Sequence, residues 1–174
     1  MCYCWFVATF VNYGTMFGLK YVHSDLFWTS LAFGIAYVVG YISIGFCAGK
    51  FGRRRTIFLQ FFISGLFFII YQIIYKSLPP IPTIAFIWIQ KIFAEGGFGM
   101  VYLITSEIFP TVYRATVFGI VNFFARIGGI TVPYVNEEAK SSYMMIFAIL
   151  SFIAALTCLF LPETKGQPLK DHLE

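Results

Sequence analysis

Three ionisable residues interrupt the apolar part of this sequence: Lys91, Glu95 and Arg126. Arg126 follows Arg114 by twelve residues of a largely apolar run. In a helix that rises about 1.5 Å per residue, this spacing puts its guanidinium roughly 18 Å along the axis. If the helix enters a membrane near Arg114, Arg126 lies near the middle of a hydrocarbon core about 30 Å thick. A charge at that depth is costly unless it faces a helix bundle or a water-filled cavity, so we expect Arg126 to be functional.

Lys91 and Glu95 are four residues apart, which places them on one face of a helix, where they can neutralise each other. Arg126 is then an unpaired cation, and an unpaired cation in a cavity attracts anions. In the alternative arrangement, Arg126 pairs with Glu95 and forms a structural lock. The first arrangement predicts a substrate site for an ionised ligand, with Arg126, Lys91 and Glu95 among its residues.

Aromatic side chains are candidates to line the same cavity. Phe98, Tyr102 and Tyr13 could stack on an amphiphilic substrate whose selection depends on shape and on one or two charges. The first apolar segment also offers Asn12 and Tyr13 amid its aromatics. Most of the 22 phenylalanines must instead face lipid or fill helix contacts. We therefore predict that Asn12, Tyr13, Phe98 and Tyr102 bind substrate.

The sequence offers no catalytic or metal-binding pattern. Nothing in it resembles a nucleophile with its base, a phosphate-binding loop or a metal cluster, so we expect neither an enzyme nor a cofactor. The four cysteines lie in or beside apolar segments and show no metal-ligand spacing with the two histidines. The net charge of +4 fits the loops of a membrane protein rather than a nucleic-acid surface, because the basic residues lie between apolar runs.

Apolar segments of membrane-spanning length make up most of the chain. Of 174 residues, 59% are hydrophobic and 11% are charged, and the mean hydropathy is +0.80, which is typical of a multi-span membrane protein. In lipid, each span must satisfy its own backbone hydrogen bonds, so runs of this length are helices. The sequence predicts an all-α membrane protein with six transmembrane helices, at residues 2–19, 26–48, 56–75, 81–105, 115–135 and 143–161, and a polar tail at 162–174.

Lysine and arginine are unevenly divided between the two ends of these helices. Seven of the twelve lie on the side of the 49–55 hinge, the 107–114 turn and the tail, and three lie on the other side. Cytoplasmic loops carry the excess of basic residues. We therefore expect the side with seven, which also holds both chain ends, to be cytoplasmic.

The segment GFCAGKFGRRR forms a basic hinge between the second and third predicted helices. Gly45 and Gly52 would allow close helix approach and a tight turn. One interpretation is a positively charged loop that only sets the topology. The other is a salt-bridged latch, in which Arg53 or Arg54 pairs with Glu107 in one conformation and releases it in another. The residues of this predicted latch are Gly45, Gly52, Arg53, Arg54, Glu107 and Arg114.

Four segments in the same order resemble one transporter family. The stretch that begins with Gly45 and continues, after three residues, with GKFGRR resembles the loop motif of the major facilitator superfamily. The segments YLITSEIFPTVYRATVFGI, LPETKGQPL and WFVATFVNYG are similar to parts of its organic ion transporter family, whose members carry organic cations, organic anions and carnitine. The resemblance covers nearly the whole chain, as the C-terminal six-helix half of a twelve-helix carrier. It implies alternating access in the plasma membrane, with a missing N-terminal half or a second copy as the partner.

This resemblance also bears on single positions. Organic anion and carnitine carriers tend to have a basic residue where Arg126 stands, and organic cation carriers an acidic one. The resemblance therefore implies organic anions or carnitine-like zwitterions as substrates. Gly49 replaces the acidic residue of the loop motif, so we expect the latch to depend more on Glu107. Glu95 stands where the family leads us to expect a small residue.

Two other functions remain open at this stage. SEIFP and PETKG also resemble sugar porters, although charges at membrane depth suit an ionised substrate better than a neutral one. The chain starts abruptly at an apolar span, and we expect it to be a fragment. As a native product, half a carrier would expose the face that packs on its partner, and it could act as a non-transporting membrane interaction partner.

Overall fold

Six α-helices account for nearly all of the described chain. The computed structural model describes residues 1–18, 26–74, 80–138 and 143–166, and within these ranges it contains no strand. The predicted all-α fold with six helices is confirmed. Four lysines used in the orientation prediction (Lys20, Lys76, Lys140 and Lys170) and positions 167–174 of the predicted tail lie outside the described residues. The helices are α1 (Cys2–Gly18), α2 (Leu26–Phe51), α3 (Arg53–Ile74), α4 (Pro80–Ile108), α5 (Thr111–Glu138) and α6 (Tyr143–Cys158).

Several helix ends differ from those expected from the apolar pattern. The helices α2, α3, α4 and α5 run into the charged segments at their ends, because charge does not stop a helix that has left the hydrocarbon. Backbone geometry stops it instead. The predicted 49–55 hinge shrinks to Gly52, whose φ of 90° no helix accommodates, and Pro110 separates α4 from α5. The last helix ends at Cys158 rather than at residue 161, because the next three backbone N–H groups bond to carbonyls three residues back.

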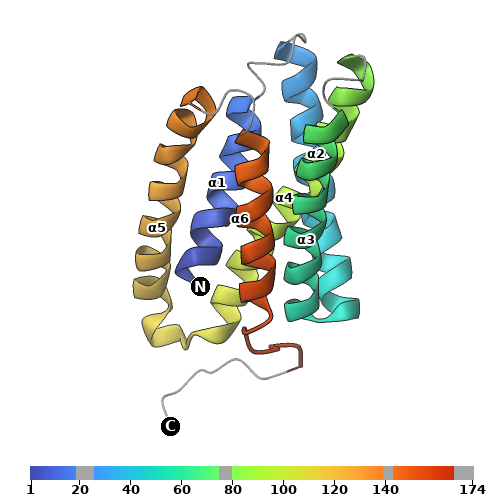
Figure 1. Ribbon diagram of the computed structural model, residues 1–174. Coiled ribbons are helices and arrows are strands. Elements are labelled where there is room, and N and C mark those ends of the chain that lie inside the picture. The colour runs from blue at the N-terminus through green and yellow to red at the C-terminus, as the bar shows by residue number, and fades with distance from the viewer. Residues whose placement is uncertain (19–25, 75–79, 139–142, 167–174) are drawn as a thin grey trace.

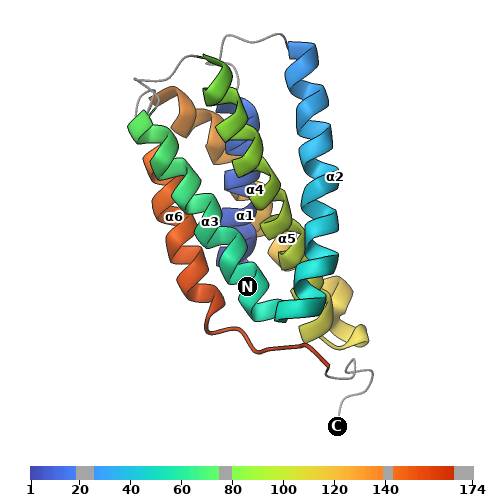
Figure 2. The same cartoon turned by 90° about the vertical axis from the view of Figure 1, so that its right-hand side faces the viewer.

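The helices form two layers. The centre of one layer, which we name the front layer although it lies behind the other in the view of Figure 1, is α1 beside α4; α5 packs along the other side of α1, and α2 along the other side of α4. The back layer consists of α3 and α6, which pack mainly on each other and also contact α4 and α1 respectively. Figures 1 and 2 show that the N-terminus of α1 and the end of the described chain lie at the same end of the bundle. We call this the hinge end, because it also holds Gly52.

Close backbone approach holds the front layer together. A Cβ atom on Gly128 of α5 would lie 2.7 Å from the carbonyl oxygen of Phe6 on α1, and one on Gly40 of α2 would lie 2.9 Å from that of Ile92 on α4. Between helices in lipid, where apolar burial gives little driving force, such small residues allow the backbone contacts that stabilise packing. These two crossings fix α5 and α2 on the two sides of the central pair.

The outer surface of the bundle is apolar. Within the described residues, three helices are long and apolar enough to cross a membrane, namely Ser30–Phe51, Arg53–Ile73 and Thr111–Glu138, and Tyr143–Cys158 is a shorter apolar helix. Large side chains such as Ile42, Phe46 and Ile73 are about two-thirds or more exposed. In a soluble domain this surface would drive aggregation, whereas in a bilayer it faces acyl chains.

Candidate functional site

A groove of about 230 Å³ lies between α1 and α5 on the front layer. Gly129 lies beside it, where a Cβ would make ordinary van der Waals contacts, at 3.6 Å from the ring of Tyr13 and 3.7 Å from the methyl group of Thr9. The buried hydroxyl of Thr9 has no hydrogen-bond partner among the described residues, so a polar group remains available beside the groove. The α1–α5 groove is lined by Thr9, Tyr13, Phe17, Ala125, Arg126, Gly129 and Ile130.

Arg126 is the only ionisable residue, apart from the tyrosine phenol, among the residues lining this groove. It lies on the exposed side of α5, and within the described chain no carboxylate lies within ion-pair distance of its guanidinium. The alternative in which Arg126 pairs with Glu95 is therefore not the arrangement in this structure. Glu95 is already bound to Lys91, with 2.8 Å between Nζ and Oε1.

Aromatic residues continue the surface from the groove toward α4. Tyr102 is about one-third exposed, its hydroxyl bonds to Asn122, and its ring contacts Trp5 at 4.2 Å and Phe98 at 5.2 Å between centroids. The charge of Arg126 acts on the same hydroxyl. The predicted residues Tyr13, Tyr102 and Arg126 therefore lie on one face, and Phe98 supports that face from a half-buried position.

Lys91 and Glu95 lie inside the bundle. The Lys91 side chain is 3% exposed and that of Glu95 is 4% exposed. Besides Glu95, the ammonium donates to the side chain of Asn12 at 2.8 Å and to the Asn12 carbonyl at 3.2 Å, and it lies 5.6 Å from the centre of the Phe33 ring. This Lys91–Glu95–Asn12 cluster ties α1 to α4 by charge-assisted bonds.

The cluster lies apart from the α1–α5 groove. Lys91, Glu95 and Asn12 are buried and are not among the residues that line the α1–α5 groove. The reason is mutual satisfaction: a buried lysine is tolerated where a carboxylate and an amide neutralise and solvate it, and these partners then turn inward with it. The depth of the charges was inferred from sequence, but their direction depends on tertiary packing.

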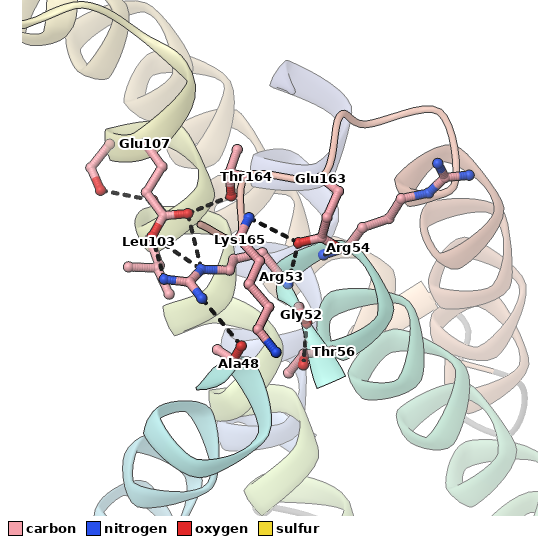
Figure 3. A network of polar contacts seen from close by, with 11 residues as sticks. Ala48, Gly52, Arg53, Arg54, Thr56, Leu103, Glu107, Glu163, Thr164 and Lys165 are labelled. Atoms are coloured by element: carbon pink, nitrogen blue, oxygen red, sulfur yellow. Dashed lines mark hydrogen bonds and ion pairs between the residues drawn. The ribbon is translucent and has the colours of Figure 1, made fainter. Parts of the chain in front are cut away.

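A second group of polar residues lies at the hinge end (Figure 3). Arg53, the first residue of α3, donates from Nε to both oxygens of Glu107 at 3.2 Å and from Nη2 to one of them at 3.1 Å. A further guanidinium nitrogen donates to the Ala48 carbonyl at 3.3 Å. The Thr164 hydroxyl also donates a hydrogen bond to the Glu107 carboxylate. This hinge network joins α2, α3, α4 and the segment after α6.

Glu163 caps the start of α3 from a distant part of the chain. Its carboxylate accepts the backbone N–H groups of Arg53 at 2.8 Å and of Arg54 at 3.2 Å, which have no partner within the helix. Partial burial raises the pKa of the Glu163 carboxyl, but the N–H groups of Arg53, Lys165 and Arg54 and the charge of Arg53 outweigh it and hold the pKa below its ordinary value. Gly52 makes room for this cap, because a Cβ there would lie 2.8 Å from a Glu163 oxygen.

Three residues of the predicted latch, Arg54, Arg114 and Gly45, lie outside the Arg53–Glu107 contact. The side chain of Arg54 points away from Glu107 (Figure 3), because the first turn of α3 directs Arg53 toward α4. Arg114 donates to the Phe109 carbonyl at 3.4 Å and holds the turn between α4 and α5. A Cβ on Gly45 would meet nothing within 4 Å, so no close helix approach requires this glycine. The structure brings together Gly52, Arg53 and Glu107.

Sequence reasoning missed Glu163, Thr164 and Trp5. The first two belong to the PETKG segment, whose resemblance to a transporter motif was noticed but not connected with the hinge. Trp5 is fully buried beneath Tyr102, and its indole N–H donates to the Thr105 hydroxyl at 3.0 Å. A tryptophan early in an apolar segment gives no signal that would separate this role from lipid contact.

Comparison with known proteins agrees with this architecture. The model of the Major Facilitator Superfamily matches residues 1–173. Human solute carrier family 22 member 13 is 35% identical over 98% of this chain, and the match covers 31% of that protein. Organic anion transporter 3 of Sus scrofa and the organic cation transporter protein of Drosophila melanogaster are each 27% identical over 98% of this chain, with 32% and 31% of their own lengths covered.

These relatives establish a class of transport proteins rather than enzymes. The chain spans about a third of the length of the curated relatives it matches, and their names include both organic anions and organic cations. The family model covers nearly every residue, and the helices that it matches are apolar over membrane-spanning lengths. The chain is thus a multi-pass membrane protein that belongs to the Major Facilitator Superfamily and is homologous to the organic ion transporters of solute carrier family 22.

Proposed function

We propose that this chain forms the C-terminal six-helix half of a twelve-helix carrier that moves organic ions by alternating access, with organic anions preferred to simple organic cations. The observation that carries the proposal is the environment of Arg126. Its guanidinium belongs to a groove with aromatic walls, and no acidic residue lines that groove. Lys91 and Glu95 compensate each other elsewhere, so the groove has a positive charge.

The chemistry of this groove suits an amphiphilic anion. An arginine binds a carboxylate or sulfonate through two parallel hydrogen bonds, which a narrow site of low dielectric strengthens. Tyr13 and Tyr102 offer ring faces for the apolar body of the substrate, and Thr9 offers a hydroxyl. A carnitine-like zwitterion places its ammonium on the tyrosine rings, because Glu95 is committed to Lys91.

The same proposal gives the hinge network a role in the conformational cycle. In such carriers, two halves rock around a site near the middle of the membrane, and contacts at the helix ends form in one state and break in the other. The Arg53–Glu107 pair links α3 to α4, so it would stabilise the state in which the hinge end is packed. We place this end in the cytoplasm of a plasma-membrane carrier, and we assign the front layer to contact with the N-terminal half.

Uptake by the full-length carrier tests the proposed charge selectivity. Arg126→Asp should abolish uptake of an organic anion such as a labelled aryl carboxylate, because the site then repels it. Arg126→Lys should retain part of that uptake with a higher KM, because one point charge replaces a two-pronged contact. Surface expression measured in parallel separates lost function from misfolding. Wild-type uptake of tetraalkylammonium that anionic competitors leave unchanged would falsify the preference.

A further inference from the structure

A second hollow lies at the hinge end, away from the α1–α5 groove. Its volume is about 530 Å³, and it lies where α2 meets α3 beside the end of α6. It shares no lining residue with the groove. Its lining residues are Phe51, Gly52, Arg54, Arg55, Phe58, Leu159, Glu163 and Lys165. We refer to it as the basic hollow.

The charge of the basic hollow is mostly uncompensated. Arg54, Arg55 and Lys165 bring three cationic side chains, all exposed. Glu163 supplies the one carboxylate among the described residues that line it, and this carboxylate accepts backbone N–H groups from the start of α3 and from Lys165. Among the residues that the structure describes, no acidic side chain forms an ion pair with Arg54 or Arg55. A ligand at this position therefore meets a positive field with unused guanidinium donors.

One wall of the same hollow is apolar. Phe51 is 47% exposed and Leu159 is 38% exposed, and Phe58 lies half-buried between α3 and α6. Two candidate spans adjoin here, since one ends at Phe51 and the next begins at Arg53. The hollow therefore lies at the level where hydrocarbon gives way to headgroups. A free phosphate ion would use only the cations, whereas a phospholipid would use both walls.

We propose that the basic hollow binds an anionic phospholipid, with Arg54 and Arg55 on the phosphate, Lys165 near the headgroup and an acyl chain against Phe58 and Leu159. Guanidinium groups match phosphate oxygens in pairs, and basic pockets between helices at the cytoplasmic surface suit anionic headgroups. The site is independent of the proposed substrate. Because Lys165 follows Glu163 and Thr164, a bound lipid would also hold the hinge network in its packed form.

Lipid binding to the purified full-length carrier in phosphatidylcholine nanodiscs tests this site. Photoactivatable phosphatidylserine is the probe, and peptides carrying the cross-link are identified by mass spectrometry. Arg54→Gln and Arg55→Gln should each reduce labelling by about fivefold, the effect of one basic residue at a membrane surface. Arg114→Gln removes the same charge from a residue outside the hollow, and it should leave labelling unchanged. The side chains of Arg54 and Arg55 are exposed, so the variants at these two positions should fold normally.

Two further measurements separate the lipid from other ligands. Leu159→Gln should weaken phosphatidylserine labelling without changing binding of inorganic phosphate, because only an acyl chain uses that wall. The proposal is overturned if inorganic phosphate displaces phosphatidylserine efficiently. It is also overturned if Arg114→Gln reduces labelling as much as Arg54→Gln does, since the attraction would then be a general surface charge.

Discussion

Lys91 is among the most completely buried side chains of the described residues, although lysine has a strongly hydrated ammonium group. Its burial is tolerated because Glu95 neutralises it and Asn12 accepts two of its hydrogen bonds. A pair of this kind contributes little net stability compared with apolar residues of the same size. Loss of one partner, however, leaves an uncompensated charge in the core.

Glu95→Ala should therefore destabilise the carrier strongly, by about 3–5 kcal/mol. The double variant Lys91→Met/Glu95→Leu should recover most of that loss, because it removes both charges and keeps the volume. Thermal unfolding of the purified carrier measures the difference. If Glu95→Ala alone were as stable as the double variant, the pair would not be the buried unit described here.

Gly52 and Gly45 form a matched pair of glycines for a second test. Gly52→Ala adds a methyl group at a φ of 90°, 2.8 Å from a Glu163 oxygen. It should destabilise the α2–α3 junction by about 1–2 kcal/mol, the cost of a left-handed conformation for a residue with a Cβ. Gly45→Ala lies in a helix with open space around it and should not destabilise the protein, because alanine favours a helix more than glycine does. Equal effects of the two variants on the unfolding temperature would contradict the assigned role of Gly52.

At the scale of helices, the start of α3 is stabilised by a residue 110 positions further along the chain. Glu163 has no helix of its own to cap, and it supplies the carboxylate that the first N–H groups of α3 lack. The same terminal segment contributes Thr164 to Glu107. The segment after α6 therefore couples the ends of α3 and α4.

Glu107→Gln should weaken the contact between α3 and α4 without touching the α1–α5 groove. We expect slower uptake by the full-length carrier with substrate affinity nearly unchanged, because the variant shifts the balance of conformations rather than the site. The Arg53 and Glu107 side chains are only 24% and 16% exposed, so the pair should matter more than a surface salt bridge. Glu138→Gln, an exposed carboxylate at the far end of α5, is the control. Unchanged turnover in Glu107→Gln would contradict a latch.

The cap by Glu163 should depend on pH. Because the folded state lowers the pKa of Glu163, its stabilisation is fully present above the ordinary carboxyl pKa and is lost as the pH falls through the lowered value. Hydrogen-exchange protection of the Arg53 and Arg54 amides, taken as the ratio of wild type to Glu163→Gln, should therefore fall toward one on acidification. A ratio that stays constant over this range would show that the carboxylate charge does not hold the cap.

Contacts within one helix were predictable from the sequence, and those between distant helices were not. The pairing of Lys91 with Glu95 follows from a four-residue spacing. The hydrogen bonds that Lys91 donates to Asn12 join positions 79 residues apart, and no local pattern encodes which way the Lys91–Glu95 pair turns. The same distinction applies to helix ends. The sequence predicts the end of α4 from Pro110, whereas the start of α3 at Arg53 depends on a cap from Glu163, which lies outside the helix.

At the scale of the whole molecule, the front layer and the outer surface have different chemistry. The outer surface is mainly aliphatic and phenylalanine-rich, whereas the front layer carries Arg126 and exposed tyrosines such as Tyr13, Tyr37 and Tyr41. Such a face is too polar for acyl chains and too aromatic for ordinary solvent contact. This chemistry agrees with our proposal that the front layer contacts an N-terminal half.

Membrane orientation is testable through the hinge end. Arg54→Cys and Lys165→Cys, each introduced into a carrier without its native accessible cysteines, should react with an impermeant maleimide only after the cells are permeabilised. The basic residues concentrated at this end give the physical reason. Labelling of either position in intact cells would reverse the topology and, with it, the proposed direction of the latch.

Trp5 has a consequence for optical experiments. Its indole is shielded from solvent, donates a hydrogen bond to Thr105 and lies against the ring of Tyr102. The Tyr102 hydroxyl interacts electrostatically with Arg126. A ligand that reorients Tyr102 would alter the surroundings of the indole without touching it. The chain has two further tryptophans, Trp28 and Trp88. In a variant that keeps Trp5 as its sole tryptophan, near-ultraviolet emission should thus follow occupancy of the groove in real time, with no label attached and no transport required.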